Sequence, residues 1–88
     1  MTKHYVYILK NEKVGRRYKG MTQDLDGRLK EHNRGKTKST KEEKGWEIEY
    51  FEIFNTREKA RAREKYFKTA AGRRWIKKKL GPIVQRIE

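Results

Sequence analysis

The large apolar residues of this 88-residue chain occur in short segments, and the longest run near its start is Tyr5-Val6-Tyr7-Ile8-Leu9, five residues long. A run of this length suits a β-strand and falls far short of the ~20 residues of a membrane span. A chain of this size buries only roughly 60% of its extended surface, so nearly all large apolar side chains must share one core. We expect one domain over residues 1–82, followed by a poorly specified tail at 83–88.

The chain is strongly basic, with 25 Lys and Arg against 12 Asp and Glu and a formal net charge of +13. Nucleic acid is the commonest partner for such a positive potential, whereas a membrane surface would call for an amphipathic anchor helix or a lipidation signal. Ten aromatic residues in ordered alternation argue against disorder. We therefore expect nucleic acid, either DNA or RNA, as the partner, and no membrane contact.

Cysteine is absent, which excludes a disulfide framework, a thiolate nucleophile and a Cys-type zinc site. A chain without cysteine suits a reducing compartment, and no signal-peptide core is present, so we expect a cytoplasmic protein. Because no nucleotide-binding loop, cofactor motif or protease-like triad occurs, we expect no small-molecule cofactor.

Segments rich in aromatic and β-branched residues predict three strands, at 4–10, 16–21 and 46–54. A hairpin centred on the intervening loop pairs Tyr7 with Tyr18, which places both tyrosines on one face of the sheet. The third strand has large apolar residues at neighbouring positions, which predicts burial on both of its faces: Ile48, Tyr50, Phe51, Ile53 and Phe54.

Capping and breaking signals predict three helices: one from a cap at Thr22 or Asp24 to about Asn33, one from a cap at Asn55 or Thr56 to about Ala71, and one over 73–80. Gly72 is expected to separate the last two. The polar segment from 34 to 45 has no apolar residue and reads as a surface loop. The order β-β-α-β-α-α predicts an α+β sandwich, with helices packed on a largely antiparallel three-stranded sheet.

Several polar residues fall on the apolar faces of these helices. Leu25 and Leu29 set the buried direction of the first helix, and His32 lies beside them with Arg28 as its i, i+4 neighbour. In the second helix Glu64 lies within an apolar stripe formed by Ala60, Phe67 and Ala71. A carboxylate there requires a partner, either an ion pair with Arg28 or a metal ion.

Together these residues match what hydrolysis of a phosphodiester requires, namely a divalent cation, a guanidinium and a base. Glu64 supplies one hard oxygen ligand, which suits a single Mg²⁺ or Mn²⁺ ion with water completing its coordination. Arg28 supplies a permanent charge for phosphate. His32 is the default base, because histidine has an ordinary pKa of ~6.5 whereas tyrosine starts near ~10.

The order and spacing of these residues resemble those of the GIY-YIG nuclease superfamily, specifically its small stand-alone members. Tyr5-Val6-Tyr7 stands where the GIY element would be, and Tyr18-Lys19-Gly20 stands where YIG would be, about ten residues later. The resemblance continues through the helix at 24–33 and the segment at 62–68, and it extends to about Leu80.

The resemblance implies a metal-dependent endonuclease in which Tyr7 is the general base and Arg28 the catalytic arginine. It makes Glu64 the metal ligand and gives Tyr18 and His32 positioning and tuning roles. This differs from the default drawn from the residues themselves, so His32 stays open as an alternative base. Lys19 replaces the middle isoleucine of the second tripeptide.

The basic charge is concentrated in residues 57–80, which carry eleven basic and two acidic side chains. Phosphate contacts fix position without reading sequence, so we expect a preference for flaps, nicks or single strands, or little preference at all. Trp46 and Trp75 are expected in the core rather than stacked on bases. The candidate nucleic-acid-binding residues are Lys38, Lys41, Arg61, Arg63, Lys68, Arg73 and Arg74.

Two alternatives to an endonuclease remain at this stage. The chain can be a nucleic-acid-binding module that keeps the fold without effective catalysis, or a basic protein whose partner is structured RNA. Loss of metal-dependent cleavage on replacement of Glu64 separates catalysis from binding alone.

Overall fold

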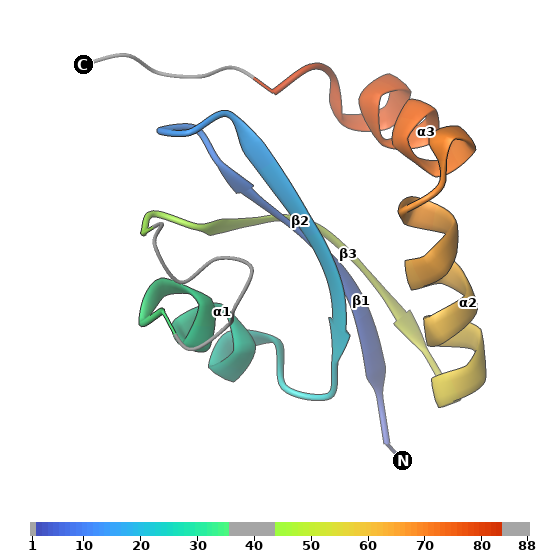
Figure 1. Cartoon of the computed structure of the whole chain (residues 1–88). Coiled ribbons are helices and arrows are strands. Elements are labelled where there is room, and N and C mark those ends of the chain that lie inside the picture. Colours follow the sequence, from blue (N-terminus) through green and yellow to red (C-terminus); the bar gives the residue numbers. More distant parts are fainter. Residues whose placement is uncertain (1, 36–43, 84–88) are drawn as a thin grey trace.

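The computed structural model describes residues 2–35 and 44–83, which form an antiparallel sheet and the helices packed on it (Figure 1). The elements are β1 (His4–Asn11), β2 (Arg16–Thr22), α1 (Leu25–Asn33), β3 (Glu47–Phe54), α2 (Arg57–Phe67) and α3 (Ala70–Leu80). The strand order is β2-β1-β3, and both pairings are antiparallel. The predicted α+β architecture and element order are confirmed. Within the described ranges, no helix is long and apolar enough to cross a bilayer.

The central strand β1 supplies the core on both sides of the sheet, because successive side chains of a strand point to opposite faces. Val6 and Ile8 face α2 and α3, where they pack with Ala60, Phe67 and Ile76. Tyr7 and Leu9 face α1, where they pack with Trp46, Tyr18, Leu25, Leu29 and Ile48. Figure 1 shows α1 on one side of the sheet and the α2–α3 pair on the other. The expected core placement of Trp46 is confirmed, with 2% of its surface exposed.

The hairpin register differs by two residues from the predicted one. Tyr7 pairs with Gly20 and Leu9 pairs with Tyr18, whereas the sequence pattern had suggested Tyr7 opposite Tyr18. A shift of two keeps every side chain on its face, since the side-chain period of a strand is two. The expectation that Tyr7 and Tyr18 share a face is therefore right, although their direct pairing is wrong.

The boundary between α2 and α3 also differs from the prediction. α2 ends at Phe67, and Gly72 lies inside α3 rather than between the helices. Thr69 is the N-cap of α3, and its hydroxyl accepts a hydrogen bond from the Gly72 amide. A Cβ at position 72 would lie 1.8 Å from the carbonyl oxygen of Tyr66. Gly72 is thus required by the close approach of the two helices and does not mark a helix end.

The expected burial of β3 on both faces is wrong for one end of the strand. Phe51 is 45% exposed and Ile53 is 48% exposed. Both residues pair with the Tyr5–Tyr7 part of β1, while the α1 side chains pack at the Leu9–Trp46 end of the same face. The nine-residue α1 therefore covers only part of its side of the sheet.

Candidate active site

The hydroxyl of Tyr7 is the centre of a polar cluster between the sheet and α1. It lies 3.0 Å from Nε2 of His32 and accepts a hydrogen bond from Nε of Arg28 at 3.4 Å. Tyr7 is 1% exposed and His32 is fully buried. The sheet carries the phenol and α1 carries the other two groups, so the local fold, with Asp24 as the N-cap of α1, brings them together.

Gly20 makes room for this arrangement. A Cβ at position 20 would lie 2.5 Å from the Tyr7 hydroxyl oxygen and 3.1 Å from Cε1 of Tyr18. The phenol of Tyr7 therefore lies directly over the backbone of its cross-strand partner. This gives the glycine of the second tripeptide a steric role that its sequence position alone does not reveal.

Burial sets the protonation of the cluster. It raises the pKa of Tyr7 to about 12, and the hydrogen bond from Arg28 opposes this rise only in part. Burial, together with the positive charge of Arg28, lowers the pKa of His32 to about 4. At neutral pH Tyr7 is therefore protonated and His32 is neutral. A guanidinium can only donate hydrogen bonds, so the Tyr7 hydroxyl accepts one from Arg28. The same hydroxyl can donate a hydrogen bond to Nε2 of a neutral His32.

Tyr18 joins the same cluster from β2. Its ring centroid lies 4.5 Å from that of His32, 6.3 Å from that of Tyr7 and 6.5 Å from that of Trp46. Tyr18 is half-buried, so it lies nearer to solvent than Tyr7. The two motif tyrosines and the helix histidine are thus packed as one aromatic group.

Arg28 pairs with a different carboxylate from the one considered from the sequence. Its Nη1 lies 3.1 Å from Oε2 of Glu31 on the same helix, whereas Glu64 lies 3.4 Å from Nζ of Lys68. The suggested Glu64–Arg28 ion pair is therefore wrong. About a third of the Arg28 side chain is exposed, so the guanidinium spans the buried Tyr7 hydroxyl and the solvent.

Glu64 approaches from the other layer of the fold. Its side chain is 17% exposed and lines a hollow of about 280 Å³ together with Thr22 and Gln23 at the end of β2. No hydrogen bond between described residues joins Glu64 to the tyrosine cluster, but its negative charge is close enough to contribute to the raised pKa of Tyr7. Of the five predicted catalytic residues, four are in contact with one another: Tyr7, Tyr18, Arg28 and His32. The fifth, Glu64, lies close enough for its charge to act on Tyr7.

The donor set around Glu64 fits a single hard cation. Within the described ranges no group of three or more His, Cys, Asp or Glu side chains is placed to hold a metal, and Glu64 is the one carboxylate among the described residues that line this hollow, which also include His4, Arg57 and Arg61. Its half-buried position beside a hydroxyl and an amide leaves room for water and a phosphate oxygen, which is how Mg²⁺ is commonly held. The site does not match a two-metal carboxylate cluster.

Arg63, one of the predicted phosphate-binding residues, is engaged within the fold. Its guanidinium donates two hydrogen bonds to Glu52, at 2.9 and 3.2 Å. The same group lies 4.6 Å from the ring centroids of Phe67 and Trp75. Arg63 therefore covers the aromatic core with its charge already paired.

The other predicted basic residues have varied surroundings. Arg61 lines the Glu64 hollow, and Lys68 pairs with Glu64 itself. Arg74 is exposed on α3, and Arg73 lines a separate cavity between α3 and β2. Lys38 and Lys41 lie outside the described residues.

Two basic residues that line the same cavity as Arg73 were not predicted as binding residues from the sequence. They are Lys19 and Lys77. Two signals were available for them. Lys19 alternates with Tyr18 along β2 and must face the other side of the sheet, and Lys77 follows Arg73 by one helical turn.

Comparison with known proteins identifies a family for this chain. The GIY-YIG catalytic domain family matches residues 3–79. The chain is 37% identical over 78 residues to the UPF0213 protein SSP2268 of Staphylococcus saprophyticus, covering 88% of this chain and 94% of that protein. It is 42% identical over 77 residues to a UPF0213 protein of Bacillus pumilus, covering 86% and 72%.

A solved structure gives the same result for the fold. The solution NMR structure of the UPF0213 protein BH0048 from Bacillus halodurans matches with a TM-score of 0.55 at 32% sequence identity, covering 90% of this chain and 86% of that one. With a family match that spans nearly the whole chain, this protein belongs to the GIY-YIG nuclease family.

Proposed function

We propose that this protein is a divalent-metal-dependent endonuclease that hydrolyses phosphodiester bonds in DNA. The observation that carries the proposal is the buried contact of Tyr7 with His32 and Arg28, because a paired acid–base and a guanidinium at one point suit phosphoryl chemistry. The net charge of +13 supports a polyanionic substrate.

In this proposal Tyr7 is the base and His32 positions it. A phenol with a pKa of about 12 is a poor base by itself at neutral pH, because its phenolate is scarce. Arg28 stabilises the phenolate through the hydrogen bond that it donates to the same oxygen, and the phenolate takes the proton of the attacking water. His32 stays neutral: it is fully buried behind Tyr7, and its Nε2, 3.0 Å from the hydroxyl, holds the phenol in place.

The remaining groups act on the phosphate. The exposed part of Arg28 is placed to bind a non-bridging oxygen, and the edge of Tyr18 helps to hold the phosphate against the sheet. Glu64 would hold one Mg²⁺ or Mn²⁺ ion, which when bound supplies charge stabilisation at the leaving oxygen and lowers the pKa of water.

Replacement of Glu64 tests this function. Glu64→Gln keeps the size of the side chain and removes its charge, so we expect metal-dependent cleavage to fall at least about a hundredfold while DNA affinity stays equal or rises. Cleavage is measured on supercoiled plasmid and on flap, nicked and single-stranded oligonucleotides, with Mg²⁺, with Mn²⁺ and with chelator. Glu64→Ala is expected to behave in the same way.

Glu58→Gln is the matched control, because Glu58 is an exposed carboxylate on the same helix. It should cleave like the wild type. If the wild-type protein binds DNA and cleaves no substrate with either metal, the protein is a binding module. Tighter binding to structured RNA than to DNA, without cleavage, would instead favour an RNA partner.

A further inference from the structure

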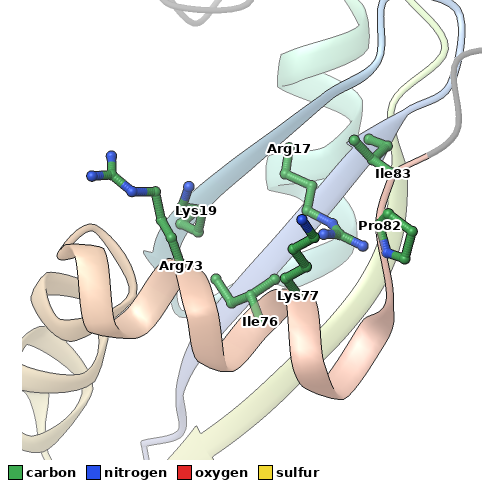
Figure 2. A pocket seen from close by; sticks show the side chains of 7 residues that line it. All are labelled: Arg17, Lys19, Arg73, Ile76, Lys77, Pro82 and Ile83. Atoms are coloured by element: carbon green, nitrogen blue, oxygen red, sulfur yellow. The ribbon is translucent and has the colours of Figure 1, made fainter.

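A cavity of about 360 Å³ lies between β2, α3 and the segment that follows α3, on the opposite face of β2 from the tyrosine cluster. Figure 2 shows the side chains that line it, with Lys19 and Arg73 near one end and Arg17 and Lys77 near the other. Ile76 forms an apolar floor between these cations, and Pro82 and Ile83 form one wall. The volume is at the lower end of the range for small-ligand pockets, about 300–1,000 Å³.

Arg17 is the structural member of this group. Its guanidinium donates to both carboxylate oxygens of Glu49, at 2.7 and 3.0 Å, and to the carbonyl oxygen of Gly81 at 2.8 Å. Glu49 is the extra residue of a bulge in β3, which lets its carboxylate reach Arg17. Arg17 thus ties the end of α3 to β2 along one side of the cavity, with its own charge paired.

The other three cations have no such partner. No carboxylate of residues 2–35 and 44–83 lies within ion-pair distance of Lys19, Arg73 or Lys77. Burial lowers the pKa of Lys19, and the charges of Arg73, Lys68 and Arg17 lower it further. The half-buried Lys19 thus shares the cavity with Arg73 and Lys77, and an anion bound there relieves the repulsion among these three positive charges.

The arrangement suits one nucleotide better than a free anion. Positive groups at both ends match the phosphates on either side of a nucleoside, and the apolar floor and wall between them match an unstacked sugar and base. Bases in a duplex are stacked inside the helix and cannot reach into a pocket on the protein surface, whereas a single strand exposes them.

We propose that this cavity binds one unpaired nucleotide of a single-stranded segment of the substrate, with Lys19, Arg73 and Lys77 on its phosphates. This deepens the proposed nuclease function and rests on DNA being the substrate. β2 is an edge strand, with Tyr18 on one face and Lys19 on the other, so a strand crossing this edge passes from the tyrosine cluster into the cavity. The cavity therefore selects substrates with a single-stranded segment beside the cleavage site.

The test compares two double variants that each remove two positive charges. Lys19→Gln with Lys77→Gln removes two cations from the cavity. Lys78→Gln with Lys79→Gln removes two from another face of α3, where both lie beside Trp75. Binding of a labelled oligothymidylate of about 10 nucleotides and of a blunt duplex of equal length is followed by fluorescence anisotropy in chelator.

We expect the cavity variant to bind the single strand at least about tenfold more weakly in 0.1 M salt, with its salt slope reduced by about 1.4. The control variant should lose much less single-strand affinity, and both variants should lose similar duplex affinity. Pro82→Ser changes the apolar wall at an exposed position, and it should weaken single-strand binding without changing the salt slope.

Equal losses of single-strand affinity in the two double variants would overturn the inference, and so would a wild-type protein that binds the single strand no better than the duplex. Because no metal is present, these outcomes are independent of cleavage. If the wild type cleaves DNA and the two double variants lose equal single-strand affinity, only the cavity site is disproved. If the wild type never cleaves and only the cavity variant loses single-strand affinity, only the endonuclease is disproved.

Discussion

The Tyr7–His32 contact at the centre of the site is costly to bury unless each group satisfies the other. Two polar rings are removed almost completely from water, and their shared hydrogen bond of 3.0 Å replaces contacts that each ring would make with solvent. The contact therefore depends on His32 staying neutral, since an imidazolium would be buried beside the guanidinium of Arg28.

This dependence predicts how stability changes with pH. In the unfolded chain His32 has the ordinary histidine pKa of ~6.5, and in the folded protein the pKa is about 4. The unfolded state takes up the proton first, so the stability from a neutral His32 is complete above pH 6.5 and is lost as the pH falls toward 4. We expect a loss on the order of 2 kcal/mol between pH 7 and pH 5, measured by urea unfolding.

His32→Gln is the control for this effect, because glutamine keeps a hydrogen-bonding side chain without a titrating ring. The variant should be less stable than the wild type at pH 7 and should show a smaller loss of stability between pH 7 and pH 5. An unchanged pH dependence in the variant would assign the acid sensitivity to carboxylates elsewhere in the chain.

Between elements, the contact of α2 with α3 depends on Gly72. Its missing Cβ allows the backbone of Tyr66 to approach, and any side chain there would meet that carbonyl oxygen at 1.8 Å. The helices must therefore separate to accept even alanine, which would disturb the packing of the buried Phe67 and Ile76.

Replacement of Gly72 by alanine distinguishes the effect of helix packing on stability from the effect of helix propensity, because the two have opposite signs. Propensity alone predicts that Gly72→Ala stabilises α3 by about 1 kcal/mol, whereas the clash predicts destabilisation by about 2 kcal/mol or more. We expect destabilisation in urea unfolding at pH 7. At the neighbouring exposed position, Ala71→Gly should cost only about 0.5–1 kcal/mol through propensity. A Gly72→Ala protein more stable than the wild type would show that the helices separate at little cost.

These element contacts explain which parts of the fold the sequence could predict. Local periodicity and capping predicted every strand and helix, and the face shared by Tyr7 and Tyr18 followed from the alternation of β1 and β2. The register and the role of Gly72 depend on contacts between segments that local patterns do not record. The exposure of Phe51 likewise depends on how far α1 extends over the sheet.

The same division holds for the candidate site. Tyr7, Arg28 and His32 could be placed together because the buried direction of one helix and the facing strand predict it. The partner of Glu64 could not be predicted, since it depends on which basic side chain comes nearest in a chain that has 25 of them. The cavity at Lys19 depends on how the end of α3 is tied to β2 by Arg17, a contact across 64 residues of sequence.

At the scale of the whole molecule, like-charge repulsion is the dominant electrostatic effect. The net charge is +13, and the two ion pairs that are mostly shielded from solvent, Arg17–Glu49 and Arg63–Glu52, are bonded closely at 2.7 and 2.9 Å. Salt screens exposed charges strongly and shielded pairs much less. Added salt should therefore remove more repulsion than attraction, and the folded state should become more stable.

We expect the midpoint of thermal unfolding to rise by about 4–8 °C between 20 mM and 300 mM sodium chloride, which corresponds to about 1 kcal/mol for a domain of this size. Differential scanning calorimetry at pH 7 measures the rise. The double variant Lys78→Gln with Lys79→Gln has a lower net charge, so it should start from a higher midpoint at 20 mM salt and gain less on adding salt. A midpoint that falls with salt in the wild type would mean that ion pairs outweigh repulsion, and the basic surface would then contribute to folding rather than oppose it.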